Sequence, residues 1–346
     1  MKQQKNNEDK KLNTKIGKLE LNSCVSLAPM AGITDYVLRN LIRKYSKTCL
    51  LTTEMISSEA LIQESKRRAR AAGAPENSLI LREENHSPIA YQLTGHKPKL
   101  MAEAAKIIEK YADIIDINMG CPVNKVVKGN DGCALMRTPE LASDIVKAVK
   151  DSVDRPVSVK FRLGYTMDEL NFVEYGQAMQ NAGADFITIH GRTRSQMYSG
   201  NADWHKISEL KKNVDIPVFA NGDVKSVESA IDCMVKSSAD GVAVGRGVLG
   251  DISLLSRIEH FFLTGEILPQ PTLAEKIELL KEHLQEEVRL RGEDVGIKFC
   301  RKFYPYYING VKNAAKYRSE LVLETNIEKI HRQLDSILET QCSCGV

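Results

Sequence analysis

Cys121 is the residue of this sequence best suited to donate a proton. It lies in the run Asn118-Met119-Gly120-Cys121-Pro122, and the glycine-containing loop Lys128-Gly129-Asn130-Asp131-Gly132-Cys133 follows it. A thiol can act as a general acid when basic groups nearby stabilise the thiolate that remains. A lone cysteine is more often a small buried hydrophobic residue, and we interpret the other seven of the eight cysteines in this way. The loop after Cys121 could close over a bound substrate.

Lys160 could hold an anionic group. It ends the run Val157-Ser158-Val159-Lys160. If the valines of a strand face outer helices, the alternation of side chains directs Ser158 and Lys160 into the interior of a barrel. The partner of such an amine is either a neighbouring carboxylate in a salt bridge or the anionic ring of a reduced cofactor. The sequence leaves both partners open.

Two glycine-containing turns could bind a phosphate group. The run Gly245-Arg246-Gly247-Val248-Leu249-Gly250 has the spacing of a dinucleotide-binding motif, but a helix and a proline-containing linker follow it instead of a second strand. Its glycines let backbone amides approach, the next helix presents its positive end, and Arg246 adds a charged fork. The run Asn221-Gly222-Asp223 lies after the preceding strand, where barrel phosphate sites are common. A phosphorylated cofactor is expected.

His190 lies in the run His190-Gly191-Arg192-Thr193-Arg194. A buried histidine with satisfied hydrogen bonds is the simpler interpretation of such a residue. Two arginines at alternate positions beside it favour contact with an anion.

Short apolar runs alternate with helical patterns along the chain, which predicts a parallel sheet built from βα units. The last predicted strand and its helix end near residue 263, close to the length of about 250 residues typical of a (β/α)8 TIM barrel. Recurring Ala-Asp and Pro-Val openings support a closed barrel. An open doubly wound sheet is the alternative, but nothing divides the chain into two nucleotide-binding halves. The predicted strands are 24–28, 49–53, 88–93, 113–118, 156–161, 185–190, 216–220 and 240–245.

The ends of the predicted strands are polar around nearly the whole rim. One polar strand end is typical of a solvated cap, but a complete rim is not, and the active site of a TIM barrel lies at the C-terminal ends of its strands. These residues are Pro29, Met30, Glu54, Gln92, Asn118, Cys121, Lys160, Arg162, His190, Arg192, Asn221, Gly222, Asp223, Gly245 and Arg246.

A second, helical part is predicted after the barrel. The run Leu268-Pro269-Gln270-Pro271-Thr272 indicates a linker, because two prolines resist helix continuation. Apolar residues at helical spacing then predict a small bundle. We expect a disordered leader over 1–15, a catalytic barrel over 16–265, a linker over 266–272, a helical domain over 273–340 and a tail over 341–346. The apolar residues are Ile277, Leu280, Leu284, Val288, Ile327, Ile330, Leu334 and Ile337.

Composition excludes several classes of protein. The first 15 residues lack the apolar stretch of a signal peptide or membrane helix, so we expect a cytoplasmic protein without membrane contact. The cysteines are scattered and form no CxxC pair, which favours reduced thiols and argues against structural zinc, including at Cys342 and Cys344. The net charge of +3 is too small to indicate a nucleic-acid partner by itself.

Basic charge is nevertheless concentrated near the C-terminus. Between Arg291 and Arg318 there are seven basic and two acidic residues, a local net charge of +5, with aromatic residues interleaved. We expect most of the aromatic residues in the core of the bundle. The basic face, including Arg301 and Lys302, is then a surface suited to RNA phosphates.

Taken together, these motifs resemble the tRNA-dihydrouridine synthase family, most closely its bacterial B-type branch. The resemblance extends from Leu27 to Arg318. One departure is Gly132-Cys133, where the B-type branch more often has Gly-Ser. The motifs are Ala28-Pro29-Met30-Ala31-Gly32-Ile33-Thr34-Asp35, Gln92-Leu93, Asn118-Met119-Gly120-Cys121-Pro122, Lys160-Phe161-Arg162-Leu163-Gly164, His190-Gly191-Arg192-Thr193-Arg194, Asn221-Gly222-Asp223 and Gly245-Arg246-Gly247.

The resemblance implies an FMN-dependent enzyme that acts on tRNA. FMN would be reduced by NAD(P)H and pass a hydride from flavin N5 to C6 of a flipped-out uridine, while Cys121 protonates C5. Asn118, Arg162, Arg192, Arg301 and Lys302 would contact the tRNA substrate. We expect a monomer without a metal. The residues that would hold FMN are Pro29, Met30, Ala31, Gln92, Lys160, His190, Asn221, Gly222, Asp223, Gly245 and Arg246.

Two other functions stay open at this point. One is an FMN barrel that acts on a free pyrimidine, of the dihydroorotate dehydrogenase type, which would explain the cofactor residues but not the basic helical part. The other is a tRNA-binding or chaperone-like protein in which the barrel is only a scaffold. Such a protein would be colourless even with added FMN.

Overall fold

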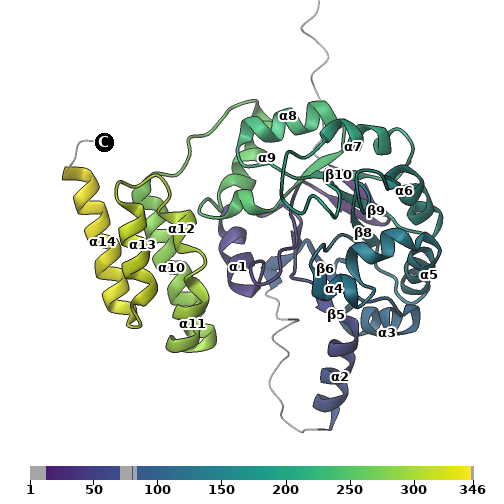
Figure 1. Cartoon of the computed structure of the whole chain (residues 1–346), viewed down its shortest axis with the longest axis horizontal. Coiled ribbons are helices and arrows are strands. Elements are labelled where there is room, and N and C mark those ends of the chain that lie inside the picture. Colours follow the sequence, from purple (N-terminus) through teal and green to yellow (C-terminus); the bar gives the residue numbers. More distant parts are fainter. Residues whose placement is uncertain (1–12, 71–79, 81–83, 344–346) are drawn as a thin grey trace, which may run out of the picture.

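The structure of the chain, a computed structural model, describes residues 13–70, 80 and 84–343. Figure 1 shows a barrel of strands surrounded by helices, with a second group of helices beside it. Residues 1–12 of the expected leader lie outside the described residues, as do residues 344–346 of the expected tail, with Cys344 among them. The side chain of Cys342 lies outside them as well.

A closed parallel sheet forms the centre of the barrel. Its strands are hydrogen-bonded in the order β3 (Val25–Leu27), β11 (Gly241–Val244), β10 (Val218–Asn221), β9 (Phe186–His190), β8 (Val157–Arg162), β7 (Ile114–Asn118), β6 (Ile89–Thr94) and β4 (Leu51–Thr52). A parallel bridge between Ser26 and Leu50 joins the two ends of this order. The predicted (β/α)8 barrel and its eight strands are therefore confirmed. A short strand that the sequence analysis missed, β5 (Ile56–Ser57), pairs with β6.

The register of the strands brings the polar strand ends together. Asn118 of β7 is paired with Lys160 of β8, and Arg162 of β8 with His190 of β9. His190 is in turn paired with Asn221 of β10. Residues far apart in the chain thus become neighbours on one rim.

Helices cover the outside of the barrel. Their apolar faces are buried against the valine and isoleucine side chains that the strands direct outward. Prolines at the first turn begin α3 and α5, where the missing N–H leaves no hydrogen bond unmade. The helices are α1 (Tyr36–Tyr45), α2 (Ser58–Ala69), α3 (Pro98–Ile108), α4 (Asn124–Lys128), α5 (Pro139–Lys150), α6 (Phe172–Asn181), α7 (Trp204–Lys211), α8 (Val227–Ser237) and α9 (Leu254–Thr264).

A hairpin that the sequence analysis missed closes the end of the barrel at which the strands begin. Strands β1 (Thr14–Ile16) and β2 (Leu19–Leu21) pair antiparallel, so the leader predicted over 1–15 was drawn too long at its C-terminal end. Ile16 and Leu21 are fully buried among interior side chains of the barrel strands. Each strand has only three residues, too few for a visible alternation of polar and apolar residues.

The second group of helices, which we call the helical region, comprises residues 273–343. Thr272 begins it with a capping box, in which its hydroxyl accepts from the N–H of Glu275 and the Glu275 carboxylate accepts from the N–H of Thr272. No helix or strand lies between Gly265 and Thr272, where the linker was predicted. The division into two domains stays a prediction. The helices are α10 (Leu273–Arg291), α11 (Glu293–Cys300), α12 (Tyr304–Tyr307), α13 (Ala314–Leu323) and α14 (Ile327–Ser343).

The predicted apolar stripes of the helical region form its core. Ile277, Leu280 and Leu284 of α10 are fully buried, and so are three residues of α14 at the same spacing, Ile330, Leu334 and Ile337. Helix α10 also packs against α1 of the barrel. Within the described ranges, no helix has the length and apolar character needed to cross a membrane.

Candidate active site

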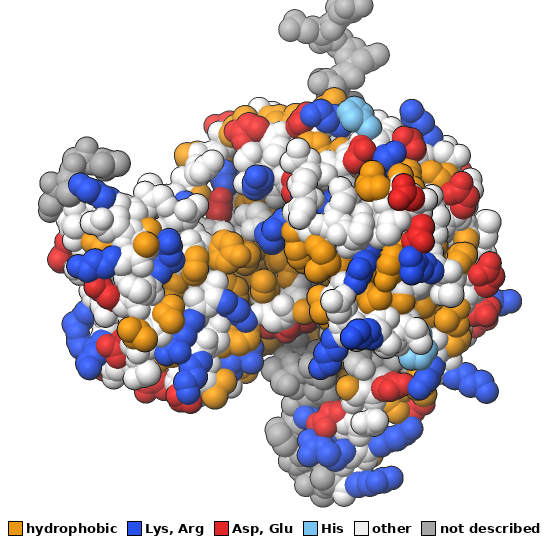
Figure 2. Space-filling model, viewed as in Figure 1, with side chains coloured by type: hydrophobic (Ala, Val, Ile, Leu, Met, Phe, Trp, Pro, Cys, Tyr) orange, Lys and Arg blue, Asp and Glu red, His pale blue; other side chains and the backbone are white. Residues whose placement is uncertain are grey.

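A cavity of about 630 Å³ lies at the C-terminal ends of the barrel strands. Its size is in the range of about 300–1,000 Å³ that is common for small-molecule sites. Every residue predicted to hold the cofactor lines it, and so do Cys121, Asn118, Arg162 and Arg192. In Figure 2, hydrophobic side chains gather in the hollow between the barrel and the helical region, with lysines and arginines around it. All of the predicted rim residues except Glu54 therefore share one site.

A chain of hydrogen bonds positions the backbone of Cys121. The buried carboxylate of Asp116 accepts from Nε2 of Gln92 at 2.6 Å and from Ser158 at 2.5 Å. Oε1 of Gln92 then accepts from Nδ2 of Asn118 at 2.7 Å, and Oδ1 of Asn118 accepts from the N–H of Cys121 at 2.9 Å. Because an ionised carboxylate can only accept, this chain fixes the orientation of both amides.

Asp116 is a functional residue that the sequence analysis missed. Burial raises the pKa of its carboxyl, and the hydrogen bonds from Ser158 and Gln92 oppose that shift. The sequence held a usable signal, since Asp116 lies two residues before Asn118 on one strand and therefore faces the same side.

Replacing Asn118 with its acid is expected to destabilise the protein although the shape barely changes. In Asn118→Asp, a second carboxylate oxygen would face Oε1 of Gln92, which cannot turn because Asp116 holds its amide. We expect a loss of about 1–3 kcal/mol in unfolding free energy, measured by urea unfolding at neutral pH. The loss should shrink as the pH falls, because the protonated new carboxyl can donate to Gln92. Equal stabilities of Asn118→Asp and the exposed control Asn309→Asp would contradict this chain of hydrogen bonds.

Cys121 lies half-buried at the edge of the cavity. Burial raises the pKa of its thiol, while a backbone hydrogen bond at Val123 and the charges of Arg162 and Lys160 act in the opposite direction. The thiol therefore stays protonated at neutral pH, and two cations stand near the sulfur. Such a group can give up a proton and leave a stabilised thiolate.

The loop after Cys121 is attached to the barrel on two sides. It contains the short helix α4 and Gly132. Only glycine fits at position 132, because its φ is positive at 59° and a Cβ there would lie 2.7 Å from the carbonyl oxygen of Cys121. Asp131 accepts from His96 at 2.8 Å, and Arg194 donates to Asn124 at 2.5 Å. Closure of this loop over a substrate stays a prediction.

Lys160 reaches the cavity without a protein partner. Its side chain borders the interior void of the barrel together with Ser158, as the alternation predicted. Among the described residues, no carboxylate or carbonyl pairs with its ammonium, so the salt bridge that the sequence left open is not formed there. Burial and the charge of Arg162 lower its pKa to about 8. A cation is thus available for an anionic or carbonyl-bearing ligand.

Arg162 and Arg192 were predicted to bind substrate, and both line the cavity. Their guanidinium groups mainly hold loops. Arg162 donates to the carbonyl oxygen of Gly120 at 3.0 Å, and Arg192 donates to that of Gly200 at 2.6 Å and to Asp223 at 2.8 Å. These contacts favour a role in shaping the cavity, and direct contact with substrate stays a prediction.

His190 is neutral in this site. Burial, followed by the positive charges of Arg162 and Lys160, lowers its pKa well below the usual value. Its Nε2 atom lies 3.3 Å from Nη1 of Arg192. A neutral imidazole can form hydrogen bonds with a ligand without adding charge.

The turns after β10 and β11 leave backbone exposed to the cavity. Gly222 has a φ of 118°, and a Cβ there would come within 2.9 Å of His190, so only glycine fits. A Cβ at Gly245 would meet nothing closer than the sulfur of Met30 at 3.7 Å, which leaves open space beside the turn. The helix predicted after the run 245–250 is α9, which begins at Leu254. Within the run, a three-residue 3-10 turn, η4 (Arg246–Val248), follows β11, because closely spaced glycines disfavour an α-helix.

Aromatic residues at the cavity also escaped the sequence analysis. Tyr198, 53% exposed, lies in the loop after β9, and the guanidinium of Arg246 stands 4.6 Å from its ring centre. Tyr306 comes from α12 of the helical region and lines the same cavity. Contacts between separate parts of the chain leave no local pattern from which to predict them.

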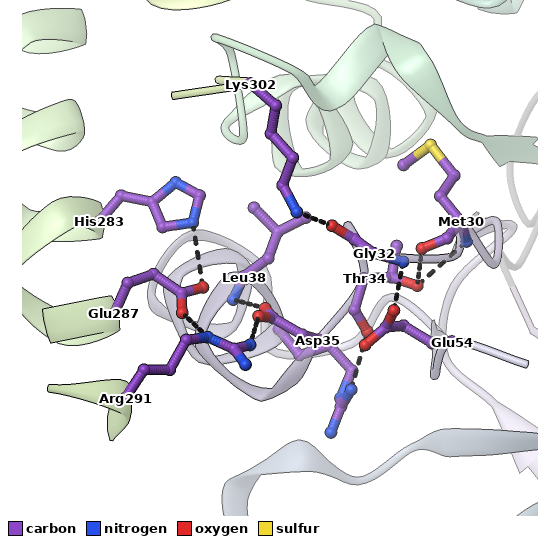
Figure 3. Close-up of polar contacts among 11 residues, drawn as sticks. Met30, Gly32, Thr34, Asp35, Leu38, Glu54, His283, Glu287, Arg291 and Lys302 are labelled. Atoms are coloured by element: carbon purple, nitrogen blue, oxygen red, sulfur yellow. Dashed lines mark hydrogen bonds and ion pairs between the residues drawn. The ribbon is translucent and has the colours of Figure 1, made fainter. Parts of the chain in front are cut away.

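Arg301 and Lys302 do not line the cavity. Arg301 is half-buried and donates to the carbonyl oxygen of Glu324 at 3.4 Å. The ammonium of Lys302 donates to the carbonyl oxygen of Gly32, in the loop between β3 and α1, as Figure 3 shows. Both residues are thus engaged within the protein.

Metal ligands or disulfides in the described part of the chain would change the chemistry that the site can perform. Among residues 13–70, 80 and 84–343, no group of three or more His, Cys, Asp or Glu side chains could hold a metal ion. The six cysteines whose side chains are described are free thiols, as predicted, and Cys121 is the one among them that is not buried.

Comparison with known proteins agrees with this arrangement. The chain is 42% identical over 330 residues to "Probable tRNA-dihydrouridine synthase 1" of Synechocystis sp., covering 95% of this chain and 90% of the relative. It is 40% identical to "Probable tRNA-dihydrouridine synthase" of Rickettsia conorii, covering 94% and 98%, and 38% identical to "tRNA-dihydrouridine synthase B" of Shewanella oneidensis, covering 91% and 95%. The family profile described as "Dihydrouridine synthase (Dus)" matches residues 26–341. The chain therefore belongs to the dihydrouridine synthase family.

Proposed function

We propose that this protein reduces uridine in tRNA to 5,6-dihydrouridine, with FMN as the cofactor and NAD(P)H as the electron donor. The observation that carries the proposal is that one cavity at the barrel rim combines a protonated thiol at Cys121 with an ammonium at Lys160 that has no partner among the described residues. The relatives named above, which match nearly the whole chain, carry the name of this activity.

The residues of the cavity fit a flavin mononucleotide. The ammonium of Lys160 can donate to the ring, and the neutral His190 can form a hydrogen bond without charge repulsion. The open space beside Gly245, with Arg246 next to it, suits a phosphate group. The residues proposed to hold FMN are those predicted from the sequence, Pro29, Met30, Ala31, Gln92, Lys160, His190, Asn221, Gly222, Asp223, Gly245 and Arg246.

When held by these residues, FMN would supply the hydride that the reduction adds to C6 of the uracil ring. Cys121 donates the proton from its Sγ to C5, so that hydrogen is added across the C5–C6 double bond. Lys160 and Arg162 stabilise the thiolate left behind. Asn118 holds the backbone of Cys121. Its amide N–H that is not donated to Gln92, which now faces the sulfur of Met55 at 4.0 Å, is proposed to turn to the uracil edge. The protein thus positions the base and provides the proton.

The test of this proposal is an assay of the purified chain with FMN, NADPH and tRNA. We expect a yellow protein that forms dihydrouridine in tRNA and leaves free uridine and dihydroorotate unchanged. Turnover of a free pyrimidine would favour the dihydroorotate-type dehydrogenase instead. A protein that stays colourless with added FMN would favour a tRNA-binding scaffold. Mapping dihydrouridine in tRNA from a deletion strain would identify the position.

The basic surface of the helical region is proposed to bind the tRNA phosphates. Lys312 and Lys316 are exposed there, whereas Lys302 is engaged with the barrel. Replacing both with alanine is expected to weaken tRNA binding and to reduce the slope of log K against log salt by about 1.5, measured by filter binding. The control removes two exposed lysines from the outer face of the barrel, Lys147→Ala with Lys212→Ala. Equal slopes for the two double variants would argue against RNA contact at the helical region.

A further inference from the structure

The loop between β3 and α1 forms one wall of the cavity. Pro29, Met30, Ala31 and Ile33 of this loop line the cavity, and we call residues 29–35 the cavity loop. Figure 3 shows that Arg291 and Lys302 of the helical region reach the cavity loop. The cavity loop is therefore held between the proposed cofactor and the helical region.

The first contact is an ion pair at the end of the cavity loop. Nη2 of Arg291 donates to Oδ2 of Asp35 at 2.6 Å, and its Nε donates to Glu287 at 2.5 Å. Asp35 is 5% exposed, and its other oxygen accepts from the N–H of Leu38 at 3.0 Å, which caps the first turn of α1. One carboxylate thus joins α1, the cavity loop and α10 of the helical region.

The second contact lies in the middle of the cavity loop. The ammonium of Lys302 donates to the carbonyl oxygen of Gly32, and the backbone N–H of Gly32 donates to the carboxylate of Glu54. The aromatic ring of Phe299 supports both cations of the helical region. Nζ of Lys302 stands 3.2 Å from the ring centre and Cζ of Arg291 stands 3.9 Å from it. The backbone at Gly32 is thereby held from the barrel and from the helical region at once.

The charges at this junction make the two parts depend on each other. Two buried carboxylates, Asp35 and Glu287, face the single guanidinium of Arg291, and His283 lies 3.7 Å from Glu287. Burial and the negative charge of Glu287 raise the pKa of Asp35 to about 7. Moving the helical region away from the cavity loop would separate Asp35 from the cation of Arg291, which is costly for a buried charge.

We propose that Arg291 and Lys302 are positioning residues for the cofactor: they hold the cavity loop in the conformation that binds FMN. The helical region then serves flavin binding as well as RNA binding. This inference rests on the proposed FMN site. It assigns Lys302 a task other than the RNA contact that its sequence context indicates.

The test compares Lys302→Met with Lys298→Met in the full chain. Lys302→Met keeps the apolar stem and removes the ammonium, whereas Lys298 on α11 pairs with Asp294 of its own helix. We expect FMN affinity, measured by quenching of flavin fluorescence, to fall about tenfold or more in Lys302→Met and to stay unchanged in Lys298→Met. The visible circular dichroism of the bound flavin should also change in Lys302→Met, because Met30 moves relative to the ring.

A second variant keeps the test informative if Lys302→Met does not fold. Phe299→Leu retains an apolar side chain but removes the ring that supports Lys302 and Arg291, so its FMN affinity should fall in the same direction by a smaller factor. Wild-type affinity and circular dichroism in both variants would overturn this inference alone. A wild-type chain that binds no FMN would overturn the proposed function together with it.

Discussion

Cys121→Ala is expected to lose about 10²- to 10⁴-fold of the rate of uridine reduction, the range typical for removal of a general acid. Binding of FMN and tRNA should stay near that of the wild type, since the backbone N–H of residue 121, held by Asn118, remains in place. Single-turnover formation of dihydrouridine by the flavin-loaded protein measures the rate directly. A rate near that of the wild type would remove Cys121 from the proposed reaction.

The matched control for this variant is Cys133→Ala. Cys133 follows in the same loop and donates its N–H to the carbonyl oxygen of Cys121 at 3.1 Å, yet its thiol is fully buried. Burial raises the pKa of Cys133 to about 12. We expect this variant to reduce uridine at close to the wild-type rate. A similar loss in both variants would indicate damage to the loop instead of a missing proton donor.

Lys160→Met is expected to weaken FMN binding about ten- to hundredfold, because a hydrogen bond from a charged donor in a buried site contributes about 1.5–3 kcal/mol. The methionine keeps the length and apolar character of the stem. Titration of flavin fluorescence measures the affinity, and Lys147→Met on the outer surface is the control for loss of charge. Equal affinities in the two variants would place the flavin away from Lys160.

The same ammonium predicts how FMN binding depends on pH. In the free protein, Lys160 is charged below its pKa of about 8 and neutral above it. Affinity should therefore be constant below pH 8 and decline above it by up to about tenfold per pH unit, since binding must then take up a proton. Lys160→Met should show no such decline. If the FMN affinity of the wild type stays constant through pH 9, the ammonium of Lys160 does not contact the flavin.

Much of the barrel and its rim could be predicted from the sequence, because two simple periodicities determine them. Buried strands read as short apolar runs, and the C-terminal ends of parallel strands meet on one rim. For this reason Asn118 lies beside Lys160, and Arg162 lies beside His190. No knowledge of side-chain contacts is needed to predict that these residues come together.

The remaining features depend on contacts that no local pattern encodes. Arg162 and Arg192 look like anion-binding residues in the sequence, but several of their donors are taken by backbone carbonyls of loops. Tyr306 and Lys302 reach the barrel only because the helical region packs against α1. Their positions follow from tertiary packing between distant segments, which propensity and spacing do not describe.

The hairpin of β1 and β2 closes one end of the barrel. Ile16 and Leu21 are buried among interior side chains of the strands, so apolar side chains close the end of the barrel opposite the cavity. Under the proposed function, NAD(P)H and the uridine would then both reach the site from the end of the barrel that carries the cavity. The two would have to bind in turn, and the first would have to dissociate before the second could bind.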